Sequence, residues 1–181
     1  MKTKTAMEYT VPVEGRDHIQ GSIHAPITLL EYGDFECPHC AATYPILKAI
    51  QQQLGDNLCF AYRNFPLANV HPHAEQAAQA AEAAAAQDSY WEMHDLLFEN
   101  QDALDIASLQ RYAQALRLNT KSFIDELLAG IYSPRVREDF VYGIRGGVNG
   151  TPTLFINGSR YDGVPNVEDL LTVMASAVRA R

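Results

Sequence analysis

The sequence has few cysteines, no long apolar run and fewer basic than acidic residues. With three cysteines in 181 residues, one thiol has no partner, so the chain does not resemble a secreted domain built on a disulfide framework. The formal net charge of −8 argues against nucleic acid or an anionic membrane as the main partner. No apolar stretch is long enough for a signal peptide or a membrane span. We therefore expect a cytoplasmic protein, or a periplasmic one if a leader has been removed.

The length and the hydrophobic content of 47% predict one ordinary domain with enough material for a core. Residues 1–25 are mostly polar and are expected to form an N-terminal arm, with a short edge strand near Thr10 to Val13. Residues 26–181 are expected to form the single domain.

The stretch that carries the chemistry is Cys37-Pro38-His39-Cys40. It follows an apolar strand pattern and precedes apolar residues at helical spacing, so the pair lies in the first turn of a helix. Unpaired N–H groups and the positive end of the helix dipole favour a thiolate on Cys37. Pro38 suits this turn because its missing N–H costs nothing there. His39 adds a positive charge or a donor, and Cys40 is the resolving thiol.

A structural disulfide and half of a zinc site are the alternatives to a redox pair. A zinc site needs two more ligands, and the sequence has no second Cys-x-x-Cys. His71 and His73 carry suitable nitrogen atoms but lie in a different segment. We therefore expect a redox pair and no metal.

Glu31 lies within the first predicted strand, six residues before Cys37. A carboxylate in an apolar strand is unfavourable unless it is paired or protonated. The strand is then either an edge strand whose Glu31 faces water, or a central one whose buried acid exchanges protons with Cys40. Cys59, in the next strand pattern, is expected to be a small core residue.

Strand patterns occupy the two ends of the chain, and helix patterns occupy its middle. Residues 27–32 and 58–65 are predicted strands around a helix that contains Pro45. No strand is predicted in residues 66–147, whose histidines are expected to cap helices or lie on the surface: His71, His73 and His94. A strand, a hairpin at Asn157-Gly158 and a final helix complete the chain.

This order resembles the thioredoxin fold, and more narrowly the DsbA-like thiol–disulfide oxidoreductases, over residues 24–181. The most specific pieces are the Cys-Pro-His-Cys motif and the stretch from Val148 to Thr153. The resemblance implies an α/β thioredoxin-like fold with an all-helical insertion between its βαβ and ββα halves. The core would comprise residues 26–65 and 148–181, with the insertion at 66–147.

The resemblance also implies roles for individual residues. Pro152 would be a cis-proline that faces the disulfide, and the Thr151 backbone would bind an extended substrate segment. Pro38 would contribute to the same substrate site. Glu31 matches the buried acid of the family, which favours the second interpretation of that residue. Arg63 is the only cation in the neighbouring strand that could pair with it.

We thus expect an enzyme that exchanges disulfides with protein dithiols or disulfides, or with small thiols such as glutathione. No cofactor is needed because the cysteine pair carries two electrons, but a redox partner must recycle the pair. One alternative is a glutathione-linked transferase or isomerase of similar fold, in which the second cysteine would be idle. The other is a binding module that senses redox state without turnover.

Overall fold

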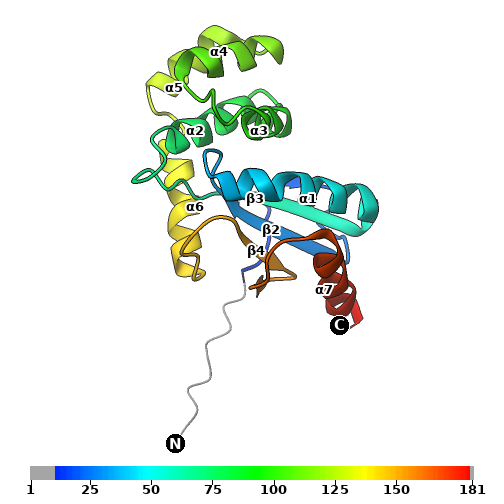
Figure 1. Ribbon diagram of the computed structural model, residues 1–181. Coiled ribbons are helices and arrows are strands. Elements are labelled where there is room, and N and C mark those ends of the chain that lie inside the picture. Colours follow the sequence, from blue (N-terminus) through cyan, green and yellow to red (C-terminus); the bar gives the residue numbers. More distant parts are fainter. Residues whose placement is uncertain (1–10, 180–181) are drawn as a thin grey trace, which may run out of the picture.

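The computed structural model describes residues 11–179 and is organised around a five-stranded sheet (Figure 1). The spatial order of the strands is β1-β3-β2-β4-β5. β2 and β3 are parallel, and the other neighbouring pairs are antiparallel. The strands are β1 (His18–Gln20), β2 (Ile27–Gly33), β3 (Leu58–Asn64), β4 (Thr153–Ile156) and β5 (Ser159–Tyr161).

The helices fall into two groups around this sheet. α1 (Pro38–Leu54) connects β2 to β3 through a short 3₁₀ turn (Gly55–Asn57), and α7 (Val167–Arg179) follows the β4–β5 hairpin. Five helices come between β3 and β4: α2 (Ala74–Ala85), α3 (Tyr90–Glu99), α4 (Ile106–Ala115), α5 (Thr120–Leu128) and α6 (Ser133–Arg145). The predicted α/β fold with a helical insertion is confirmed.

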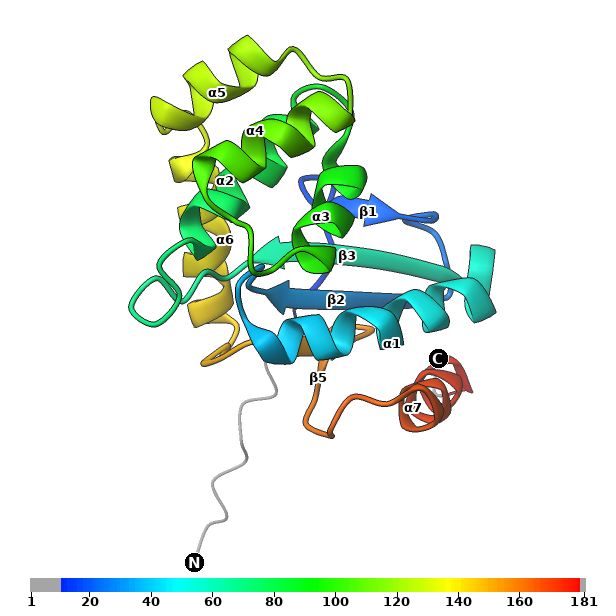
Figure 2. The ribbon, with the colours of Figure 1, turned by 45° about the horizontal axis from the view of Figure 1, so that its top comes forward.

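Both faces of the sheet are covered, which explains why β2 and β3 read as almost continuously apolar. One face packs on α1 and α7 through Leu29, Ile50 and Leu170. In Figure 2, α1 runs along β2 and α3 lies over β3, with β1 at the far edge. The opposite face packs on α6, where Phe65 and Phe140 stack with their ring centroids 4.3 Å apart.

The edge strand predicted near Thr10 to Val13 is wrong for the part that the structure describes, and Thr10 itself lies outside that part. Residues 11–13 form no strand, since Pro12 has no N–H with which to join a ladder. The edge strand is β1 instead, where His18–Gln20 pairs with β3.

His94 was expected to be a capping or surface residue, and this prediction is also wrong. It is buried in α3 with Tyr90, Met93 and Leu97. These four positions form one stripe at helical spacing that faces the sheet. Histidine is a polar residue, so the sequence pattern did not count His94 as part of that buried stripe.

Candidate active site

The two cysteines of the motif lie at the start of α1, beyond the carboxyl end of β2. Cys37 is the N-cap residue and Pro38 is the first helical residue. Both thiols are free and buried, and Cys37 is 3% exposed. The Cys37 N–H donates to the Asp34 carbonyl at 3.1 Å, which fixes the turn from strand to helix. The predicted placement of the motif in a first helical turn is therefore correct.

The surroundings of the two thiols separate their acidities. Hydrogen bonds from the Cys40 thiol and from the backbone N–H groups of Cys40 and His39 lower the pKa of Cys37 to about 5, although burial opposes them. Burial, the hydrogen bond to Cys37 and the charge of Glu31 raise the pKa of Cys40 well above its ordinary value. At neutral pH the arrangement therefore holds a thiolate beside a thiol.

The strand that returns after the helical insertion brings Thr151 and Pro152 to the cysteines. The Thr151–Pro152 peptide bond is cis. The Thr151 carbonyl oxygen lies 3.5 Å from the Cys37 Sγ, across 114 residues of sequence. The Thr151 hydroxyl oxygen is buried there and has no hydrogen-bond partner within the described residues. Cys37 and Thr151 thus meet at the site as expected, and the Thr151–Pro152 bond is cis as expected.

Glu31 is buried in the interior of the sheet, between β3 and β4, and is 2% exposed. The edge-strand interpretation is thereby excluded. Burial, together with the charge of Cys37, raises the pKa of Glu31 to about 8. Arg63 does not pair with it, because its guanidinium faces Asp17 at 2.7 Å and the Tyr32 hydroxyl at 2.8 Å. Glu31 is thus a largely neutral acid at pH 7 that responds to the charge on Cys37.

The His39 and Pro38 side chains are exposed at the rim of the site. The contribution of His39 to the thiolate comes from its backbone N–H. Its carbonyl accepts a hydrogen bond from the Thr43 hydroxyl at 2.9 Å. The predicted effect of the His39 imidazole on the thiolate stays a prediction.

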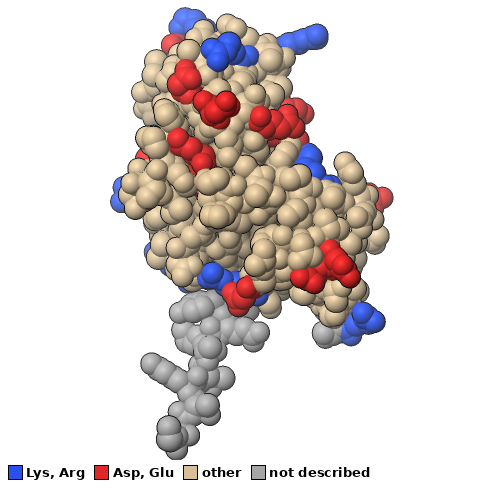
Figure 3. Space-filling view, viewed as in Figure 1, with Lys and Arg blue, Asp and Glu red and all other residues tan. Residues whose placement is uncertain are grey.

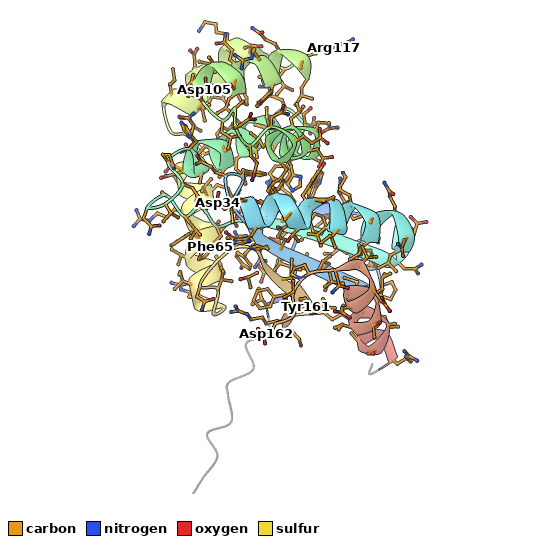
Figure 4. All side chains as sticks on the ribbon, in the orientation of Figure 1. Asp34, Phe65, Asp105, Arg117, Tyr161 and Asp162 are labelled. Carbon is orange, nitrogen blue, oxygen red and sulfur yellow. The ribbon has the colours of Figure 1, made fainter. Side chains whose placement is uncertain are left out.

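Two residues that the sequence analysis did not single out hold the site together. Asp34 is buried, and Figure 4 places it beside the first turn of α1. Gln101, from the helical insertion, donates to the carbonyls of Phe35 and Cys37 at 2.8 and 2.9 Å. The position of Asp34 directly after a buried strand was a usable signal. No local pattern marks Gln101, since its partners lie more than sixty residues away.

Two other classes of feature are absent from the part of the chain that the structure describes. Within residues 11–179, no three histidine, cysteine or acidic side chains are grouped so that they could hold a metal ion. None of the helices there has the length and apolar content needed to cross a lipid bilayer.

A thioredoxin-type sheet, a cysteine pair at the start of its first long helix and a cis-proline against that pair define the class of thiol–disulfide oxidoreductases. The Thioredoxin_4 family, described as thioredoxin, matches residues 14–175. The chain belongs to this family, and its fold is that of DsbA-like proteins.

Solved structures with the same fold include three bacterial proteins of low sequence identity. BdbD from Bacillus subtilis superposes with a TM-score of 0.83 at 22% identity and covers 95% of this chain and 97% of its own. Alpha-DsbA1 from Wolbachia pipientis superposes with a TM-score of 0.81 at 20% identity and covers 93% of this chain and 94% of its own. The catalytic domain of Proteus mirabilis ScsC superposes with a TM-score of 0.75 at 19% identity and covers 90% of this chain and 89% of its own.

The curated relatives are longer proteins. The Na(+)/H(+) antiporter NhaA 3 of Salinispora tropica is 42% identical over 174 residues, which is 94% of this chain and 26% of the antiporter. The antiporter NhaA of Herminiimonas arsenicoxydans is 36% identical over 163 residues, again 26% of that protein. The chain thus spans about a quarter of the length of the curated relatives it matches.

Proposed function

We propose that the chain exchanges disulfides with protein substrates through Cys37 and Cys40. The Cys37 thiolate attacks a substrate disulfide, and Cys40 then resolves the mixed disulfide. The observation that supports this most directly is the separation of the two acidities, with the pKa of Cys37 lowered to about 5 and that of Cys40 raised. A reactive thiolate next to a protonated thiol is what an attack followed by resolution requires.

We propose further that the same steps also run in reverse, so that the oxidised pair can donate its disulfide to a substrate dithiol. A thiolate of low pKa is stabilised in the reduced protein, which makes the oxidised form a stronger oxidant. The value of about 5 for Cys37 falls between those of about 7 for thioredoxin and about 3.5 for DsbA. The stretch from Asn149 to Pro152, which is exposed at Asn149 and half-buried from Gly150 on, supports substrate binding by strand addition at this site.

Covalent trapping tests the assigned roles. Cys40→Ser should accumulate mixed disulfides with a peptide substrate that contains a disulfide bond, because attack by Cys37 still occurs and resolution does not. Cys37→Ser should accumulate at least about tenfold less, because its remaining thiol is buried and largely protonated. Mass spectrometry under non-reducing conditions measures both.

Cys59→Ala is the matched control, since Cys59 is buried in β3 and should leave trapping unchanged. Equal trapping by Cys37→Ser and Cys40→Ser would contradict the assignment. Turnover on a small disulfide separates this function from the two alternatives. A glutathione-linked transferase would keep its activity in Cys40→Ser, and a redox-sensing module would react once without turning over.

The curated relatives suggest a second candidate partner. Because these relatives are named Na(+)/H(+) antiporters, we propose that a membrane protein of this kind is a candidate substrate. Trapping with Cys40→Ser in membranes that contain such an antiporter tests this. Absence of a covalent adduct there, with an adduct on soluble peptide substrates, would reject the antiporter as a partner.

A further inference from the structure

Glu31 begins a row of polar side chains that crosses the sheet to its edge. In the register of the strands, Glu31 of β2 is paired with Tyr62 of β3, and Tyr62 is paired with His18 of β1. Directly paired residues point to the same face, and adjacent strands lie about 4.8 Å apart. On its other side Glu31 is paired with Leu154, which has no polar atom in its side chain. The row therefore leads from Glu31 in one direction only, toward β1.

The inner part of this row contains polar atoms without protein partners. The Glu31 Oε1, the Tyr62 hydroxyl and the Tyr90 hydroxyl are all buried and have no hydrogen-bond partner within the described residues. The Tyr62 hydroxyl lies against Gly33, only 2.6 Å from the position that a Cβ atom on that residue would occupy. Buried polar groups in folded proteins are nearly always hydrogen-bonded, often to ordered water. Unpartnered polar atoms thus lie on the two inner members of the row, Glu31 and Tyr62, and on Tyr90 of α3.

The outer end of the row meets solvent at His18. Its imidazole stacks on Tyr90 with ring centroids 3.6 Å apart, and its Nε2 lies 2.9 Å from the Glu82 Oε2. The His18 side chain is 22% exposed. It lines an open hollow of about 490 Å³ together with Tyr90 and the acidic residues Asp88 and Glu92. An imidazole has one ring nitrogen that can donate a proton and one that can accept it, so His18 can pass protons between this hollow and the interior.

We propose that this row is a proton path, in which Tyr62 and His18, with Tyr90 beside them, connect the active-site acid Glu31 to the solvent at the β1 edge. The proposal rests on the thiol–disulfide exchange proposed above and assigns an exit for the proton that Cys40 must lose. Other ionisable groups facing the row come from the segments packed against it: Asp34 and Cys37 before α1, Cys40 of α1, Glu82 of α2, His94 of α3, and Arg135 and Asp139 of α6.

The proton balance of one turnover follows from this arrangement. Attack by the Cys37 thiolate forms the mixed disulfide, breaks the substrate S–S bond and releases a substrate thiolate. Because the charge on Cys37 is then gone, the Glu31 carboxyl becomes more acidic and sends its proton along the row. The Glu31 carboxylate next takes the Cys40 proton. The Cys40 thiolate attacks the Cys37 Sγ and expels the second substrate thiolate, so two electrons pass to the substrate and one proton leaves by the row.

The test separates attack from resolution in quenched-flow experiments with excess oxidised glutathione, in which mass spectrometry counts the mixed disulfide. Tyr62→Phe removes only a hydroxyl, and His18→Gln keeps a polar partner for Glu82. In both variants we expect normal attack and resolution slowed by at least about tenfold at pH 7. In His18→Ala, added imidazole should restore the rate of resolution. Tyr132→Phe, whose hydroxyl contacts Glu126 in the insertion, is the control and should resolve at the normal rate.

Each result decides the proposal. Normal resolution in Tyr62→Phe or in His18→Gln overturns it, and if Tyr62→Phe fails to fold, His18→Gln decides alone. Slow resolution in His94→Gln with a normal His18→Gln also overturns it, because the proton would then leave toward Asp95, which lies 3.0 Å from the His94 Nδ1. Failure of the wild type to attack glutathione disulfide at all would reject the proposed function, which is a different result from a change in resolution.

Discussion

Glu31 and Cys37 have pKa values displaced in opposite directions, and the charge of Cys37 acts on Glu31. The pKa of Glu31 is raised to about 8 by burial and then by the Cys37 thiolate. That of Cys37 is lowered to about 5, chiefly by the hydrogen bond from Cys40. Because the pKa of Glu31 is higher in the folded than in the unfolded protein, Glu31 contributes stability below its unfolded pKa of about 4.3. This contribution is lost as the pH rises to about 8. Cys37, whose pKa is lowered in the folded protein, has the opposite effect: its contribution to the stability of the fold grows as the pH rises from about 5 to about 9.

Glu31→Gln should therefore stabilise the reduced protein in a pH-dependent way. At pH 4 the carboxyl is protonated in both states, and the free energy of unfolding should be nearly unchanged. At pH 7 the variant should be more stable by up to about 3 kcal/mol, because the unfolded wild type gains an ionised carboxylate that the folded protein disfavours. Urea unfolding at pH 4, 5.5 and 7 measures the difference. The exposed Glu14→Gln is the control, and a Glu31→Gln effect that does not vary with pH would contradict the assignment.

Asp34 joins the start of α1 to the loop between β3 and α2. One carboxylate oxygen accepts from the Glu36 N–H, and the other accepts from the Leu67 N–H, each at 2.8 Å. The second oxygen also lies 2.8 Å from the His71 Nδ1. Burial alone would lower the pKa of His71, but the hydrogen bond and the charge of Asp34 raise it overall. Two segments that flank the cysteines are thus held by one buried side chain.

Asp34→Asn should destabilise the fold by about 1–3 kcal/mol, because an amide cannot accept all of these hydrogen bonds and leaves a buried donor unsatisfied. The loss should be larger below about pH 6.5, where His71 is protonated and its raised pKa contributes stability, and smaller at higher pH. Urea unfolding at pH 5.5 and 8.5 measures it. Asp102→Asn, at an exposed position in the insertion, is the matched control. A loss that is greater at pH 8.5 would contradict the role of His71.

Helices, strands and turns were predicted correctly from the sequence where the local signal was strong. The hairpin at Asn157-Gly158 and the helix start at Cys37 were both read from local chemistry. β1 was missed because a strand of three residues carries too little pattern and depends on β3 for its pairing. The burial of His94 was missed because its neighbours in α3, rather than its own polarity, decide which way it faces.

At the scale of the whole molecule, the site depends on contacts between distant segments. The approach of Thr151 to Cys37 was expected only from the family resemblance, since no local pattern joins residues 114 apart. The row from Glu31 to His18 depends on the register of three strands, which the sequence did not specify. Figure 3 shows that charged side chains on the viewed face gather over the helical insertion and near α7, with few between them. Charged side chains are thus unevenly spread on this face.

The titration of Cys37 tests the central claim, which is that this site holds a thiolate at neutral pH. The rate of alkylation of the reduced protein by iodoacetamide should be measured from pH 3 to 10 in a Cys59→Ala background, with mass spectrometry to confirm that Cys37 is the residue modified. The rate should rise with a midpoint near pH 5, because the hydrogen bonds that converge on Cys37 stabilise its thiolate. A single midpoint near the ordinary value of about 8.5 would contradict the account.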